Sequence, residues 1–153
     1  MNKQKKWDKR FVDLLSQIET WSSCLKRHVA CIITKDNRIL TTGYNGAPAG
    51  VPSCVERNEC IRYDSLSGQQ LEHCWGVHAE QNAILQAAKL GISLEGATLY
   101  CSCKPCSHCS KMIINSGVKR IVYRDDYPDM FASKILDSSK NIEVEKYDRS
   151  SEN

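Results

Sequence analysis

The chain has 153 residues, of which 41% are hydrophobic and 25% are charged, and its net charge is only +3. This length predicts one domain, residues 1–153, with a single hydrophobic core. The small net charge gives no reason to expect a nucleic-acid partner, and no apolar stretch is long enough to span a membrane. The first residues are polar and charged, unlike a signal peptide, so we expect a cytoplasmic protein.

Hydrophobic spacing predicts an alternation of helices and strands. Residues 7–21 repeat apolar positions every three or four residues, as an amphipathic helix does. A basic cluster is expected to belong to its frayed start and solvated face: Lys3, Lys5, Lys6, Lys9 and Arg10. Two β-rich runs joined by residues 35–37 predict a hairpin. The elements in chain order are helix 7–21, strands 29–34 and 38–42, helix 79–90, strand 97–101, helix 106–116, strand 119–123, helix 129–136 and strand 142–147. This order predicts an α/β fold whose later strands are parallel, with a disordered tail at 148–153.

Residues 43–76 lack a sustained helical or strand period. Residues 43–50, Gly-Tyr-Asn-Gly-Ala-Pro-Ala-Gly, form a turn-rich loop whose glycines allow ordinary turns or a close approach of backbone to a ligand. Residues 51–76 hold three cysteines and one histidine. A loop this long in a small domain is functional, stapled by a metal or disordered.

Nine cysteines are unusual for a chain of this kind. A secreted disulfide scaffold would be shorter, would carry an even number of cysteines and would need an export signal. We therefore expect the cysteines to be metal ligands, catalytic groups or small buried hydrophobic residues.

Two short motifs carry the chemistry. His78 and Glu80 open one predicted helix, and Cys106 and Cys109 open the next. Thiols three residues apart share one helix face, and a helix N-terminus lowers their pKa. Two thiolates and one imidazole leave a fourth position open on a tetrahedral Zn²⁺, which is typical of catalytic sites. Glu80 follows His78 by two residues, roughly 200° around a helix, so we expect it to carry protons rather than to bind the metal.

This pattern, H-x-E followed by P-C-x-x-C, is the signature of zinc-dependent nucleobase deaminases. Zinc lowers the pKa of a coordinated water, and the C4 carbon of cytosine is a suitable electrophile for the resulting nucleophile. The sequence resembles the deoxycytidylate (dCMP) deaminase family of the zinc-dependent cytidine deaminase superfamily. The resemblance extends over residues 7–147 and is carried by residues 28–33, 42–50, 77–84, 95–100, 105–114 and 121–123.

The resemblance implies a three-layer α-β-α fold with a central five-stranded mixed sheet and helices on both faces. It implies that His78, Cys106 and Cys109 bind the catalytic zinc and that Glu80 is the catalytic proton shuttle. The implied reaction is hydrolysis of dCMP to dUMP with release of ammonia, which supplies thymidylate synthesis.

Several residues are candidates for substrate binding. Asn45 is expected to contact the sugar 3′-oxygen or the phosphate, unless its loop is only a hairpin exit. Ala79 and the Ser102 region are expected to contact the pyrimidine edge through their backbone, and Tyr127 either stacks on the ring or caps the sheet. Lys26 or Arg27 could bind the phosphate, or both could be surface charges.

A second, non-catalytic zinc is also implied by the resemblance. Its ligands would be Cys24, Cys54 and His73, with Cys60 preferred over Cys74 as the fourth, so that the metal staples residues 51–76. The alternative is that these thiols are free. Cys31 and Cys101 are expected to be buried hydrophobic residues, Cys103 to pack near the site, and His108 to point away from the metal.

The resemblance further implies a homohexamer controlled by dCTP and dTTP near Asn45 and Gly46. Three other functions remain open: a deaminase acting on bases in RNA or DNA, a deaminase of free cytidine, and a zinc-stapled binding module without turnover. A nucleic-acid deaminase would be expected to have a basic or aromatic surface that the composition does not suggest.

Overall fold

The computed structural model describes residues 2–152, and its elements follow the predicted order. The insertion adds two short helical turns to that order, and the C-terminal segment adds a third. The elements are α1 (Lys3–Glu19), β1 (Ala30–Lys35), β2 (Arg38–Tyr44), α2 (Cys54–Arg57), η1 (Leu71–His73), α3 (Ala79–Leu90), β3 (Thr98–Cys103), α4 (Ser107–Asn115), β4 (Arg120–Asp125), α5 (Met130–Ser138), β5 (Glu143–Lys146) and η2 (Arg149–Glu152).

The five strands form one mixed sheet in the order β2-β1-β3-β4-β5. β1 pairs antiparallel with both β2 and β3, whereas β3, β4 and β5 are parallel. The predicted hairpin is confirmed: Asp36 and Asn37 turn between β1 and β2 with positive φ angles of 51° and 60°, as tight hairpin turns require. The helices α4 and α5 connect the parallel strands, so the prediction that the later strands are parallel is also confirmed.

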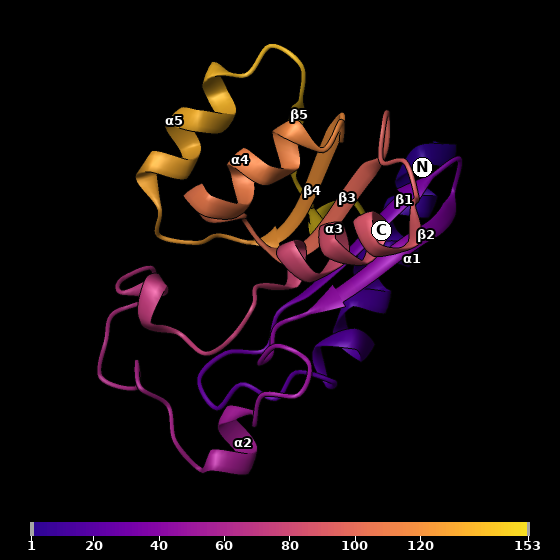
Figure 1. Cartoon of the computed structure of the whole chain (residues 1–153). Coiled ribbons are helices and arrows are strands. Elements are labelled where there is room, and N and C mark those ends of the chain that lie inside the picture. The colour runs from indigo at the N-terminus through magenta and orange to yellow at the C-terminus, as the bar shows by residue number, and fades with distance from the viewer. Residues whose placement is uncertain (1, 153) are drawn as a thin grey trace.

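The sheet is covered on both faces, as the expected three-layer fold requires (Figure 1). Successive residues of a strand point to opposite faces. Ile32, Tyr100 and Val122 therefore pack against α1, whereas Ile33, Leu99 and Ile121 belong to the core formed with α3, α4 and α5. Because α3 and α4 both lie on the second face, the starts of these two helices are brought together.

Three segments differ from the sequence-based expectations. α1 begins at Lys3, where the Asn2 side chain accepts a hydrogen bond from the Lys5 amide at 2.8 Å, so the basic cluster belongs to an ordered, capped helix rather than a frayed start. The tail was expected to be disordered, but Arg149–Glu152 forms a 3₁₀ turn; Asn153 lies outside the described residues. Within the described part of the chain, no helix has the length and apolarity needed to cross a bilayer.

A buried ion pair joins α1 to the sheet. Asp8 accepts two hydrogen bonds from the Arg120 guanidinium, both at 2.8 Å, one from the Tyr100 hydroxyl at 2.7 Å and one from the Gln4 amide at 3.0 Å. Burial by itself would raise the pKa of Asp8, but these hydrogen bonds outweigh burial and lower the pKa below its ordinary value. The carboxylate is therefore stabilised in the folded protein.

Asp8→Asn is expected to lower the free energy of unfolding by about 2–4 kcal/mol at pH 7, because it leaves the Arg120 guanidinium without its buried partner. The folded-state pKa lies below the unfolded one, so this contribution is present above about pH 4 and is lost as the pH falls through the folded-state pKa. Urea unfolding at pH 7 and at pH 3 measures both effects. The exposed Lys9–Asp13 pair gives the control: Asp13→Asn should cost roughly 0.5 kcal/mol or less, and an equal loss in both variants would contradict the prediction.

Candidate metal centre

His78 lies immediately before α3, at its N-cap. Its backbone is extended, and its amide donates to the Gln81 side-chain oxygen at 2.9 Å. The imidazole is therefore not placed by helical periodicity, which the estimate of roughly 200° requires, but projects from the helix entrance. Glu80, in the first turn of α3, is 4% exposed. One helix start thus supplies both a nitrogen donor and a buried carboxyl group.

Cys106 and Cys109 occupy the matching place on α4. Cys106 is the N-cap, and Cys109 lies in the first turn. Asp129 fixes this entrance, because one of its carboxylate oxygens accepts from the Ser107 amide at 2.8 Å while the other accepts from the Ala132 amide at 2.9 Å. Asp129 therefore caps α4 and α5 together, which was not foreseen from the sequence.

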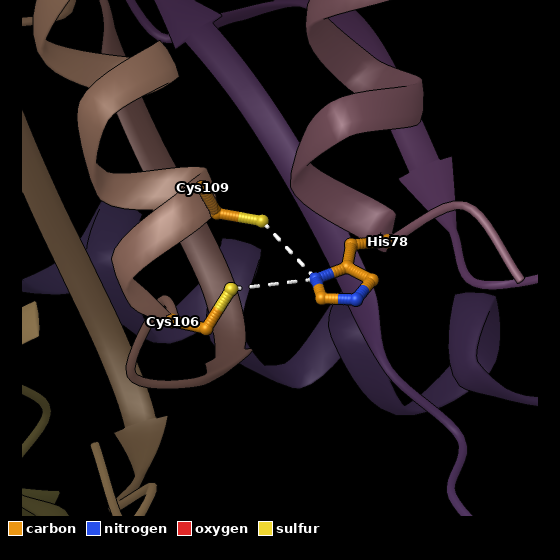
Figure 2. Close-up of side chains that lie close together, drawn as sticks. All are labelled: His78, Cys106 and Cys109. Atoms are coloured by element: carbon orange, nitrogen blue, oxygen red, sulfur yellow. Dashed lines mark hydrogen bonds between the residues drawn. The ribbon is translucent and has the colours of Figure 1, made fainter. Parts of the chain in front are cut away.

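The three predicted ligands converge (Figure 2). The His78 Nδ1 atom lies 3.4 Å from the Cys106 sulfur and 3.3 Å from the Cys109 sulfur. Tetrahedral zinc, with bonds of about 2.3 Å to sulfur and about 2.0 Å to nitrogen, would place such donors roughly 3.5 Å apart. The donor set and its spacing fit a zinc ion. Among the residues described, this is the one group of His, Cys, Asp or Glu that brings three donor atoms within 4.8 Å of one another.

The electrostatics of the site suit a metal and a proton carrier. The pKa of Cys106 is lowered by hydrogen bonds from Cys109 and His78, although burial opposes this. Burial raises the pKa of Glu80, and the Cys109 thiol donates to its carboxylate at 3.4 Å. A carboxyl group with a raised pKa can both accept and release a proton near neutral pH.

Gly43 allows α3 to approach the hairpin. A Cβ atom at this position would lie 2.1 Å from the Ala79 carbonyl oxygen and 2.7 Å from the Ala83 nitrogen. The sequence predicts that the glycines of this loop serve turns or the approach of a ligand. At Gly43 the requirement is instead the close packing of β2 against the helix that carries Glu80.

Asn45 is largely committed to the protein itself. Its side-chain oxygen accepts from the Ser22 hydroxyl at 2.6 Å and from the Val29 amide at 2.9 Å, while its NH₂ group donates to the Arg27 carbonyl at 2.7 Å. It therefore ties the segment after α1 to the start of β1. Of its four hydrogen-bonding positions, one N–H remains for a ligand.

Three of the other substrate candidates lie at the cavity beside the metal centre. A cavity of about 310 Å³ is lined by Arg27, Ala79 and Tyr127 together with His78 and Glu80. The Arg27 guanidinium lies over the Tyr127 ring, 4.9 Å from its centroid.

Ser102 and Gly46 make contacts within the chain. The Ser102 hydroxyl is buried and accepts from the Ala30 amide at 2.9 Å, so this side chain supports the pairing of β1 with β3. The Gly46 amide donates to Val77 at 3.2 Å and is not available to an anion.

Residues 51–76 extend away from the sheet, and α2 is the part of this segment that lies far from the strands (Figure 1). The thiols of Cys24, Cys54, Cys60 and Cys74 line the same cavity as His78. Burial raises the pKa of Cys54, and the three other thiols raise it further. No three of these sulfurs lie within 4.8 Å of one another, among the residues described.

His73, predicted to be a ligand with Cys24 and Cys54, does not line that cavity. Its side chain is 66% exposed and lies 3.7 Å from Glu72. The structure therefore groups Cys74, and not His73, with the other cysteines of the insertion.

The structure confirms the expected burial of the other cysteines. Cys31 and Cys101 are fully buried and face each other on β1 and β3. Cys103 is buried beside the site and lines the cavity without joining the three donors. His108 is exposed, consistent with the expectation that it points away.

A helix-covered mixed sheet that presents one histidine and two cysteines from adjacent helix starts defines a class of zinc-binding α/β proteins. Residues 5–125 match the family described as the cytidine and deoxycytidylate deaminase zinc-binding region. The chain therefore belongs to the family of cytidine and deoxycytidylate deaminases.

Individual relatives agree with this assignment. The chain is 36% identical over 144 residues to a deoxycytidylate deaminase of Schizosaccharomyces pombe, covering 92% of this chain and 44% of that protein. It is 38% identical over 126 residues to a deoxycytidylate deaminase of Mycobacterium phage D29, covering 76% of this chain and 93% of that protein. The chain spans less than half the length of its two yeast relatives.

A solved structure is similar over nearly the whole chain. The dCMP deaminase of cyanophage S-TIM5 in complex with dCMP and dUMP superposes with a TM-score of 0.78 at 32% identity, covering 96% of this chain and 99% of that one. The expected cytidine-deaminase-like fold is confirmed.

Proposed function

We propose that this chain catalyses the zinc-dependent hydrolytic deamination of dCMP to dUMP. The observation that carries the proposal is the convergence of His78, Cys106 and Cys109 beside the buried carboxyl group of Glu80. The names of the relatives, and the dCMP and dUMP bound in the similar structure, support this choice of substrate.

In this proposal His78, Cys106 and Cys109 hold the zinc ion. When bound, zinc supplies a nucleophile near neutral pH by lowering the pKa of water. Glu80 takes a proton from the attacking water and delivers it to N3 of the pyrimidine as the water oxygen bonds to C4. Glu80 then moves a second proton, taken from the new hydroxyl group on C4, to the N4 amino group. The C4–N4 bond breaks as the C4=O bond forms, and ammonia leaves. Arg27, Tyr127 and the remaining N–H of Asn45 would orient the nucleotide.

The test of this function is ammonia release from four compounds: dCMP, dCTP, cytidine and a short oligonucleotide containing cytosine. We expect turnover of dCMP above the other three. Turnover of the oligonucleotide alone would favour a nucleic-acid deaminase, turnover of cytidine alone a nucleoside deaminase, and no turnover with zinc bound a binding module.

A second zinc ion, we propose, would be held by Cys24, Cys54, Cys60 and Cys74. Backbone amides already donate to two of these sulfurs: Lys26 and Arg27 to Cys24, each at 3.4 Å, and Gly76 to Cys74 at 3.3 Å. Such outer hydrogen bonds orient metal ligands. A four-cysteine site has no open position and would be structural, drawing the insertion together around the ion.

Zinc content per chain tests this assignment. Cys54→Ser and Cys74→Ser are each expected to lower it from two ions to one, because serine is a poor zinc ligand, whereas His73→Ala should keep two. Inductively coupled plasma mass spectrometry of the purified proteins gives the counts. Loss of zinc in His73→Ala but not in Cys74→Ser would restore His73 as the ligand, and unchanged content in all three would indicate free thiols.

The family resemblance leads us to propose in addition a cytoplasmic homohexamer that supplies thymidylate synthesis and is controlled by dCTP and dTTP near Asn45 and Gly46. Light scattering would give the number of subunits. The dependence of dCMP turnover on added dTTP would show control, and a rate that does not change with either nucleotide would exclude it.

A further inference from the structure

Basic side chains line the cavity beside the metal centre. Four cations line it, and Glu80 is its one carboxyl group among the residues described. The four cations are Lys26, Arg27, Lys104 and Arg62, the last of which lies in the insertion and was not singled out from the sequence.

Two of these cations are already bound by neutral oxygens of the protein. Lys26 donates to the Arg62 carbonyl at 2.8 Å and also to the Ser65 carbonyl. Lys104 donates to the Ser133 hydroxyl at 2.8 Å. These ammonium groups hold neighbouring segments together, so they are less suited to a ligand than the two arginines.

Arg62 has donors to spare and a fixed position. Within the described part of the chain, only its Nε atom is used, donating to the Gln69 carbonyl at 2.9 Å. The Lys26 bonds hold the backbone of its loop, and no carboxylate of the described chain forms an ion pair with Arg62 or Arg27. Both terminal nitrogens of the Arg62 guanidinium are therefore available to a planar or tetrahedral anion.

The Arg62 loop closes against the opposite wall of the site. Gly68, in the same loop, comes close to Tyr127: a Cβ atom there would lie 3.6 Å from the Tyr127 hydroxyl. Burial raises the pKa of Tyr127 to about 12, although the charges of Arg27 and Arg62 oppose this shift. The guanidinium groups of Arg27 and Arg62 are thus both close enough to the Tyr127 ring to lower its pKa.

We infer that Arg62 binds the phosphate of the substrate, with Arg27 beside it, and that it sets the preference for a nucleoside monophosphate over a nucleoside. This inference rests on the proposed function. A phosphate dianion accepts paired hydrogen bonds from a guanidinium, and the insertion would carry this group to the site. Selection for phosphate would then come from the insertion, whereas the metal is positioned by the starts of α3 and α4.

Arg62→Gln is the test, with dCMP and deoxycytidine as paired substrates. We expect KM for dCMP to rise so that the ratio of kcat/KM for dCMP to that for deoxycytidine falls about 10- to 100-fold, as loss of a charge-assisted hydrogen bond predicts. Deoxycytidine, which lacks the phosphate, should change less than about twofold. Arg57→Gln makes the same charge change in the same insertion, where Arg57 stacks on Trp75 outside the cavity, and should leave the ratio unchanged.

Equal losses for both substrates would show that Arg62 only supports the fold, and an unchanged ratio would show that it does not meet the phosphate; either result overturns the inference. Calorimetric binding of dUMP and deoxyuridine separates this inference from the proposed function, because it does not require turnover. If wild-type protein fails to deaminate dCMP, the proposed function falls. A selective 10- to 100-fold weakening of dUMP binding in Arg62→Gln would still support the phosphate contact, and equal binding would overturn it.

Discussion

Glu80→Gln is expected to lower kcat for dCMP by about 10²- to 10⁴-fold while leaving the zinc content unchanged. Glutamine has nearly the same size as glutamate and keeps its place in the first turn of α3, but it cannot take a proton from water or return one to the leaving amine. Because Glu80 is a neighbour of the metal donors and is not one of them, the metal centre should still form.

Stopped-flow absorbance of dCMP conversion, combined with metal analysis, would measure both quantities. Glu59→Gln, an exposed substitution in the insertion, gives the matched control and should retain wild-type turnover. Appreciable activity in Glu80→Gln would show that another group moves the protons. Loss of zinc in that variant would instead place the carboxyl group among the ligands.

Cys109→Ser is expected to remove the catalytic zinc and to reduce turnover more than about 10²-fold. The Cys109 sulfur is fully buried and lies 3.3 Å from the His78 nitrogen. A serine hydroxyl does not become a thiolate-like ligand there, so only two strong donors remain.

Cys101→Ser provides the control for this change. Cys101 is equally buried, on the strand that leads to the metal site, but faces Cys31 and not the donors. We expect it to keep its zinc and its activity, with a small drop in the melting temperature. Full zinc content in Cys109→Ser would exclude the proposed ligand set, and equal zinc loss in both variants would indicate general destabilisation.

Much of the architecture could be predicted because hydrophobic spacing and turn residues agree with each other. Helix 79–90 was predicted with the bounds it has in the structure, since Gly91 ends it with a φ angle of 68°. The donor triad was predictable because His78 and Cys106 each precede a helix and both helices follow extended chain. The topology then brings the two helix starts together.

The rest depended on contacts that have no local signal. The start of α1 was missed because its first residues are charged and lie on the solvent side, so they add nothing to the apolar period. In the insertion, the resemblance favours His73 as a ligand, but the adjacent Cys74 lines the cavity and His73 does not. The three internal hydrogen bonds of Asn45 likewise join segments distant in the chain.

The contact at Gly43 limits how this protein can be engineered. Replacing strand glycines with β-branched residues is an ordinary route to greater thermal resistance, but here even a methyl group would displace the backbone that precedes Glu80. Directed evolution of the hairpin should therefore accept changes at the exposed Ile39. At Gly43 it should reject every residue whose side chain is larger than a hydrogen atom.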